Sequence, residues 1–251
     1  MAYQDNYQKW VDFNQLPDYL RKDLEAMDEK TKEDAFYTNL EFGTAGMRGY
    51  IGAGTNRINI YVVRQATEGL AKLIETKGDE AKNRGVAIAY DSRHFSPEFA
   101  QDSARVLAEH GIKSYVFESL RPTPELSFAV RHLNAFAGIM VTASHNPAPF
   151  NGYKVYGEDG GQMPPADADA LTDFIRAIDN PFAIEVADFE AAKSEGLIEI
   201  IGEAVDAEYL KEVKEVNINQ DLIDKFGKDM KIVYTPLHGT GEMLARRALA
   251  Q

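Results

Sequence analysis

The sequence predicts an α/β fold, with a mixed, mostly parallel sheet and helices on both of its faces. Residues 85–90, 113–117 and 136–141 are short apolar runs of the kind that form strands buried on both sides. Helical patterns separate these runs, and such alternation is typical of parallel strands joined by crossover helices. Residues 153–156 follow the third run after a turn and predict a return strand, which makes the sheet mixed.

The first forty residues are expected to form a helical extension ahead of the sheet. Leu20 and Leu24 lie one helical turn apart just after a proline, and a second helical pattern follows them. Further on, Asn59 is the predicted N-cap of a helix that runs to residue 77, where Gly78 ends it.

Two later helices share one start signal. Residues 96–98 (Ser-Pro-Glu) and 123–125 (Thr-Pro-Glu) each place a capping side chain before a proline and an acid in the first turn. The first of these helices is expected to close at residues 110–111, and the second at about residue 133. Another helix is predicted from about residue 165 to residue 178.

A glycine-rich segment precedes the helix that Asn59 caps. Five glycines lie within residues 43–54, which indicates tight turns or a close approach of the backbone to a ligand. Arg48 within this segment suits an anion, because backbone N–H groups and a guanidinium can converge on a phosphate. A glycine-rich hairpin with a surface arginine is the alternative. The segment matches neither common nucleotide-binding glycine pattern.

Polar residues follow the third buried strand directly. Residues 142–147 read Thr-Ala-Ser-His-Asn-Pro, and residues 91–94 place a second polar group after the first strand. Ligands of open α/β sheets bind at the carboxyl ends of strands, so both segments are candidates for a site. An ordinary connection between two strands, without a site, is the alternative.

Ser144 fits phosphoryl transfer better than hydrolysis. On an extended segment the neighbouring His145 would point to the opposite face, and the G-x-S-x-G elbow of many hydrolases is absent. The histidines also lack the spacing of a zinc site. For phosphoryl transfer, Lys154 could act as the base if its pKa were lowered, and Arg48 could balance phosphate charge.

Composition limits the partners. The 251 residues carry a formal net charge of −13, which argues against nucleic acid, although a small anionic substrate could still meet a locally basic pocket. No apolar run reaches the roughly 20 residues of a membrane span, and the amino terminus lacks a signal-peptide pattern. With no cysteine in the chain as well, these features predict a cytoplasmic protein without a membrane partner.

The chain is expected to divide into residues 1–183, an α/β domain with its helical extension, and residues 184–251, a linker and the incomplete start of a second, similar domain. The acidic stretch 185–229 predicts a solvated surface with one clear helix, near residues 207–216. Residues 231–234 predict a new strand. Because one strand and little more cannot bury a core, the second domain looks truncated.

Four ordered motifs resemble those of the α-D-phosphohexomutases, and their wording is most similar to the bacterial phosphoglucomutases. The motifs are FGTAGMRG (42–49), YDSRHFSPEFA (90–100), TASHNPAPFNGYKVY (142–156) and LHGTG (237–241). The resemblance implies the first domain of that fold and the interconversion of glucose 1-phosphate and glucose 6-phosphate through a phosphoserine. Phosphomannomutase or phosphopentomutase activity is the close alternative.

The resemblance also implies roles for individual residues. Ser144 would carry the phosphoryl group, His145 would contact its oxygens, Lys154 would be the acid/base, and Arg48 would be a further catalytic or phosphate contact. Substrate would be bound by Thr44, Arg48, Asn146 and Lys154. Mg²⁺ would bind the phosphate on Ser144, and glucose 1,6-bisphosphate would be the activator and intermediate.

Residues outside these roles are expected to support the site. Asp91 and Arg93 are predicted to be structural neighbours of it, whereas His238 either lines the cleft or only packs its own loop.

The chain departs from the family's pattern in one large respect. Family members have four domains and roughly twice this length, and the metal, sugar and carboxy-terminal phosphate loops do not occur among these 251 residues. The remaining metal ligands are therefore absent from this chain. We expect it to be weakly active or inactive alone, and a non-catalytic structural or interaction module is the alternative from another functional class.

Overall fold

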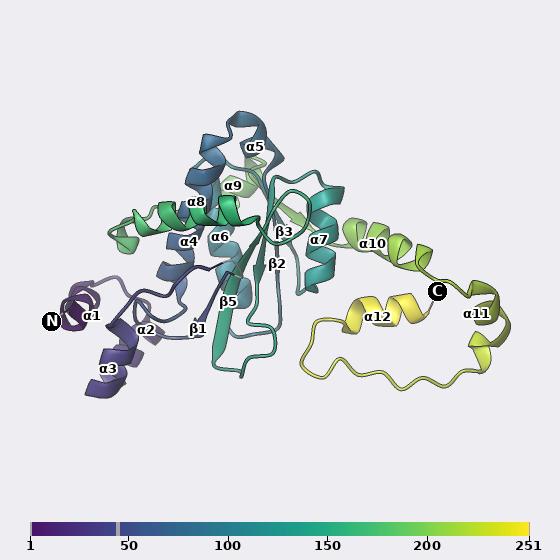
Figure 1. Ribbon diagram of the computed structural model, residues 1–251, viewed down its shortest axis with the longest axis horizontal. Coiled ribbons are helices and arrows are strands. Elements are labelled where there is room, and N and C mark those ends of the chain that lie inside the picture. The colour runs from purple at the N-terminus through teal and green to yellow at the C-terminus, as the bar shows by residue number, and fades with distance from the viewer. Residues whose placement is uncertain (1, 44–45, 251) are drawn as a thin grey trace.

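The computed structural model describes residues 2–43 and 46–250, and a six-stranded sheet lies at the centre of that part of the chain (Figure 1). The strands follow the order β1-β5-β4-β2-β3-β6. Their bounds are β1 (Met47–Tyr50), β2 (Val86–Tyr90), β3 (Ser114–Phe117), β4 (Ala137–Val141), β5 (Phe150–Tyr156) and β6 (Ile198–Ile201). β4, β2, β3 and β6 run parallel, while β5 is antiparallel to β4 and β1. The predicted mixed, mostly parallel sheet is confirmed.

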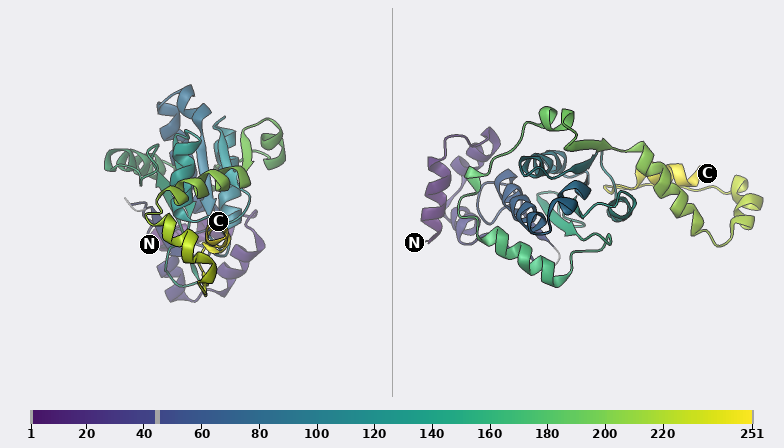
Figure 2. Two further views of the ribbon diagram at one scale, coloured as in Figure 1. Left: turned by 90° about the vertical axis from the view of Figure 1, so that its right-hand side faces the viewer. Right: turned by 90° about the horizontal axis from the view of Figure 1, so that it is seen from above.

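Helices cover both faces of the sheet. The α-helices are α1 (Ala2–Asp12), α2 (Asp18–Ala26), α3 (Glu29–Phe36), α4 (Ile60–Thr76), α5 (Asp79–Arg84), α6 (Ser96–Glu109), α7 (Thr123–His132), α8 (Pro165–Arg176), α9 (Phe189–Ser194), α10 (Glu203–Glu215), α11 (Gln220–Phe226) and α12 (Glu242–Leu249), with short 3₁₀ turns η1 (Pro181–Ala183) and η2 (Gly227–Asp229). α4, α6, α8 and α9 contribute to the larger apolar core on one face, and α7 and α10 cover the other face. Helices α1 to α3 form a further, smaller apolar cluster with Ala53 and with Tyr61 of α4, at the amino-terminal end, opposite the carboxy-terminal helices (Figure 2).

The central strands are buried along their whole length. Every residue of β2 and of β4 is buried, which explains why these segments are continuous apolar runs without alternation. Asn59 caps α4 as expected, since its side-chain oxygen accepts hydrogen bonds from the N–H groups of Tyr61 and Val62. Its amide nitrogen also donates to the carbonyls of Gly52 and Gly54, so one side chain ties the glycine-rich segment to the helix.

The predicted serine cap of α6 is wrong. Ser96 is the first residue of the helix, and the residue before it, Phe95, has a φ of 64° and makes no capping bond. The Ser96 hydroxyl instead donates to Asp91 Oδ1 at 2.9 Å, so its partner is a side chain five residues earlier and not an N–H group of the helix. Thr123 is likewise the first residue of α7, which begins after Pro122 without a side-chain cap.

The chain beyond residue 183 differs from the expectation of a single clear helix within residues 185–229. β6 pairs with β3, so the sheet extends past that position, and α9, α10 and α11 also form in this stretch. The strand predicted at residues 231–234 is wrong, because these residues pair with no neighbour and the side chain of Val233 is 98% exposed. The division at residue 183 stays a prediction.

Two remaining observations concern the helices. α12 packs beside α10, where Arg247 donates hydrogen bonds to Glu203 and Asp206. Within the described chain, no helix combines the length and the apolar character that crossing a bilayer would need.

Candidate functional site

A cleft of about 750 Å³ lies where the parallel strands β2 and β4 end. Three loops line it, at residues 91–94, 142–148 and 236–240, and the first two follow these strands directly. Parallel strands place their carboxyl ends at the same edge of a sheet, so the two polar segments meet as expected. The third loop comes from the far end of the chain.

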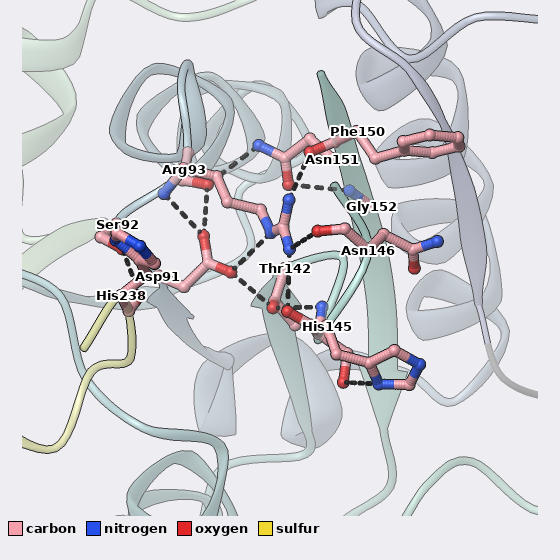
Figure 3. Close-up of polar contacts among 12 residues, drawn as sticks. Asp91, Ser92, Arg93, Thr142, His145, Asn146, Phe150, Asn151, Gly152 and His238 are labelled. Carbon is pink, nitrogen blue, oxygen red and sulfur yellow. Dashed lines mark hydrogen bonds and ion pairs between the residues drawn. The ribbon is translucent and has the colours of Figure 1, made fainter. Parts of the chain in front are cut away.

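Asp91 joins the ends of the two strands (Figure 3). Its Oδ2 accepts a hydrogen bond from Thr142 Oγ1 at 2.6 Å, and its Oδ1 accepts from the Ser96 hydroxyl and from the Arg93 N–H. Thr142 Oγ1 accepts in turn from the N–H of Ser144 at 3.0 Å. The carboxylate of Asp91 is therefore fully engaged in shaping the loop that carries Ser144.

Arg93 forms hydrogen bonds with the backbone of the same loop. Its guanidinium donates to the backbone carbonyls of Ser144, Asn146, Pro147 and Phe150 at 2.6–3.0 Å. Nε also lies 3.3 Å from Asp91 Oδ2. These contacts fit the expectation that Asp91 and Arg93 support the site without being its reactive groups.

Ser144 is exposed in the cleft and has a left-handed backbone, with a φ of 57°. A non-glycine residue in this region is strained, and such residues concentrate at functional sites. The extended conformation assumed for residues 144–145 is therefore wrong. The turn brings Ser144 Oγ within 3.4 Å of His145 Nδ1, a long but direct contact (Figure 3).

Lys154 and Arg48 lie on neighbouring antiparallel strands, β5 and β1. Lys154 is only 9% exposed, and burial lowers the pKa of its ammonium group. The charge of Arg48 lowers that pKa further, while Asp91 opposes the shift. Arg48 is exposed and pairs with Gly152 in the register.

Lys154 and Arg48 are not among the residues that line the cleft, and no hydrogen bond joins Lys154 to Ser144 among the described residues. Burial thus shifts the pKa of Lys154 in the direction that a lysine base needs, since it favours the neutral amine.

Other predicted residues differ in how well they are placed. Asn146 lines the cleft, and its side-chain oxygen is buried without a hydrogen-bond partner in the described chain. His238 lines the cleft, and its backbone carbonyl accepts a hydrogen bond from the Ser92 hydroxyl at 3.1 Å. Thr44, predicted to bind substrate, lies outside the described residues.

The described residues do not fit a complete magnesium site. No group of three or more acidic, histidine or cysteine side chains in residues 2–43 and 46–250 could hold a metal ion. Asp91, a carboxylate that binds Thr142 of the loop, already accepts hydrogen bonds from Thr142, Ser96 and Arg93. Ser144 could supply one oxygen ligand through a phosphate, and that part of the expectation stays a prediction.

Asn151 is a supporting residue that the sequence showed only as part of a turn. Its amide nitrogen donates to the His94 carbonyl and to the Ser96 hydroxyl, and its oxygen accepts from the Gly152 N–H. These bonds fix the start of β5 against the loop after β2. Beside Gly152, an asparagine is typical of a turn, so the sequence carried no signal for this role.

Comparison with known proteins identifies the family of this fold. A family model described as phosphoglucomutase/phosphomannomutase, alpha/beta/alpha domain I, matches residues 39–182. A phosphoglucomutase of Staphylococcus saprophyticus is 40% identical over 227 residues, which are 90% of this chain and 40% of that protein. A phosphoglucomutase of Staphylococcus aureus is 39% identical over 83% of this chain and 36% of its own length. The chain thus spans about 40% of the length of these curated relatives.

Solved structures share the fold. Parafusin from Paramecium, a phosphoglucomutase in its open form, superposes with a TM-score of 0.65 over 84% of this chain and 41% of that chain, at 18% identity. A Thermus thermophilus protein described as a candidate phosphomannomutase gives a TM-score of 0.58 over 71% of this chain and 36% of that one, at 27% identity. With the family model covering the sheet from β1 to β5 and its helices, the chain belongs to the phosphoglucomutase/phosphomannomutase family of enzymes.

Proposed function

We propose that Ser144 carries a phosphoryl group in the interconversion of glucose 1-phosphate and glucose 6-phosphate. The observation that carries this proposal is the placement of its hydroxyl, exposed in a cleft on a strained loop that Asp91 and Arg93 hold in shape. The Staphylococcus relatives are named phosphoglucomutases, which favours glucose phosphates as the substrates.

The chemistry is a double transfer. The phosphoserine gives its phosphoryl group to a hydroxyl of the sugar phosphate: a new bond forms between the sugar oxygen and phosphorus while the Ser144 Oγ–phosphorus bond breaks. The bisphosphate then turns over and returns its other phosphoryl group to Ser144. Each hydroxyl that attacks must lose a proton, and each oxygen that leaves must gain one.

Two groups on the chain suit these proton transfers. His145 Nδ1 lies 3.4 Å from Ser144 Oγ and can exchange a proton with it. Lys154, with its lowered pKa, is the proposed base for the sugar hydroxyl. Arg48 supplies positive charge beside Lys154. The resemblance implies that Mg²⁺ would bind the phosphate on Ser144, where it would neutralise part of the negative charge that repels the attacking oxygen.

The first test is covalent. The chain is incubated with glucose 1,6-bisphosphate and its intact mass and peptides are measured; we expect one added phosphate, on the peptide that contains Ser144. Ser144→Ala should abolish the addition, whereas Ser92→Ala, which alters another serine in the same cleft, should retain it. Phosphate that stays off Ser144 in the wild-type protein would contradict the proposal.

The second test concerns substrate and turnover. The phosphorylated chain is mixed with glucose 6-phosphate or with mannose 6-phosphate, and loss of the phosphate from Ser144 is followed. Faster loss to mannose 6-phosphate would favour the alternative suggested by the Thermus thermophilus structure. In a coupled glucose 1-phosphate assay we expect little or no turnover from this chain alone. We also propose that the protein acts in the cytoplasm.

A further inference from the structure

We propose that Arg93 is a positioning residue that turns the Ser144 loop into a receptor for phosphoryl oxygens. By fixing the carbonyls of the loop on one side, it presents the backbone N–H groups of His145 and Ala148 on the other. This inference rests on the proposed function of Ser144, and its test separates the two.

The Arg93 guanidinium is held by the loop and by Asp91. It donates four hydrogen bonds, all to backbone carbonyls, and its Nε forms an ion pair with Asp91 Oδ2. The Arg93 side chain is 13% exposed, so little water competes for these bonds. Figure 3 shows the guanidinium within the loop, and the His145 side chain on the far side of it.

The fixed carbonyls determine where the N–H groups point. In a trans peptide the C=O and the following N–H point in opposite directions, and the described chain has no cis peptide bond. Because Arg93 binds the carbonyl of Ser144, the N–H of His145 points away from the guanidinium. Binding of the Pro147 carbonyl does the same for the N–H of Ala148.

These two N–H groups are also the spare donors of the loop. The N–H of Ser144 is used by Thr142 Oγ1, and that of Asn146 is used by the Ala143 carbonyl. In contrast, the N–H groups of His145 and Ala148 have no hydrogen-bond partner within the described residues. Both belong to the loop that bears Ser144 and lines the cleft.

Free N–H groups held in place are effective ligands for a phosphoryl group. They donate to its charged oxygens without having to reorganise when charge builds up in the transition state. Lysine at position 93 would keep the positive charge but concentrate three donors on one nitrogen, so it could not hold four separated carbonyls. Arg93→Lys is therefore the informative variant.

The experiment is an amide titration of the ¹⁵N-labelled chain with inorganic phosphate as the probe. In the wild-type protein we expect saturable shifts of the His145 and Ala148 amide signals. Arg93→Lys should weaken the apparent affinity by about tenfold or more. Arg105→Lys is the matched control, because Arg105 also binds a carbonyl, of Ala187, and a carboxylate, of Asp102, but lies outside the cleft.

A second variant protects the test against misfolding. If Arg93→Lys loses its folded spectrum, Ala148→Pro removes one of the two N–H groups while leaving Arg93 in place. Unchanged phosphate affinity in either folded variant, or shifts that miss both amides, would overturn the inference.

Phosphorylation of Ser144 is measured on the same samples. If phosphate shifts the His145 and Ala148 amide signals in an Arg93-dependent way but Ser144 is never phosphorylated, the proposed function alone is refuted. If Ser144 is phosphorylated but the amide shifts are the same in Arg93→Lys as in the wild type, only the positioning role is refuted. With glucose 1,6-bisphosphate as the donor, the first-order rate of Ser144 phosphorylation should fall by about tenfold in Arg93→Lys and in Ala148→Pro. Arg105→Lys should retain the wild-type rate.

Discussion

Replacing Glu125 by Gln is expected to change how the stability of the protein depends on pH. Glu125 lies on α7 and is fully buried, and no described N–H or O–H donates a hydrogen bond to its carboxyl oxygens. Arg121 Nε is 3.7 Å away, but Arg121 directs its hydrogen bonds to both oxygens of Asp206 on α10. Arg247 adds another bond to Asp206. The two arginines thus satisfy the carboxylate of Asp206, whereas Glu125 receives no hydrogen bond that would favour its charged form.

The size of the effect follows from the pKa of Glu125. Burial, the largest cause, raises this pKa from 4.5 to about 8, and the neighbouring Asp206 carboxylate raises it further, against the opposing charges of Arg121 and Arg247. Between these two pH values the folded protein binds more protons than the unfolded chain. The free energy of unfolding therefore falls as pH rises through this window, by at most about 1.4 kcal/mol per pH unit. Below the window the stabilisation is complete, and above it the contribution is lost.

Glutamine mimics the protonated carboxyl and does not titrate. Glu125→Gln should therefore cost little at pH 5 and become progressively more stable than the wild type up to about pH 8. Urea denaturation at pH 5, 6, 7, 8 and 9 measures this difference, with Glu118→Gln, an exposed acid near the same arginine, as the control. A difference between variant and wild type that stays constant across this range would refute the reasoning.

Three further predictions concern backbone strain, an ion pair and close packing. Ser144→Gly should be more stable than Ser144→Ala by about 1 kcal/mol in thermal melts, because only glycine relieves a φ of 57°; equal stabilities would contradict a strained loop. Hydrogen bonds from His110 to Glu68 and Glu75 raise the pKa of the imidazole, partly opposed by burial. Their stabilisation should be complete below about pH 6.5 and be lost as pH rises through the raised pKa, so the advantage of wild type over His110→Gln in denaturation should shrink with pH and not grow. Gly152→Ala should cost on the order of 2 kcal/mol, because a Cβ there would lie 2.6 Å from the Thr142 carbonyl and 2.7 Å from that of Met47; a stability within 0.5 kcal/mol of wild type, roughly the scatter for surface changes, would show that the strands can separate freely.

Sequence reasoning predicted the regular part of the fold because its signals are local. Fully buried strands such as β2 and β4 appear as apolar runs, and Asn59 sits directly before the helix that it caps. The carboxyl ends of parallel strands share one edge, so bringing residues 91–94 and 142–147 together needed only the order of the elements.

The remaining features depend on which partners the folded chain supplies, and no local pattern reveals those partners. Ser96 has the signature of an N-cap, yet Asp91 captures its hydroxyl, and no local pattern shows that competition. β6 is a four-residue edge strand within an acidic stretch, and it forms because β3 offers a free edge. Residues 231–234 have the composition of a strand but find no partner to pair with. The four hydrogen bonds from Arg93 to backbone carbonyls could not be predicted either, because every residue has a carbonyl whatever its side chain.

The hydrogen bonds from Arg93 to backbone carbonyls are useful for protein engineering. Every amino acid brings a carbonyl, so Arg93 can hold the path of the loop whatever side chains stand at positions 146, 147 and 150. Shape and side-chain identity are thereby uncoupled in this part of the cleft. A library that varies Asn146 and Ala148 can alter what the cleft recognises, while a single untouched arginine keeps the scaffold of the loop intact.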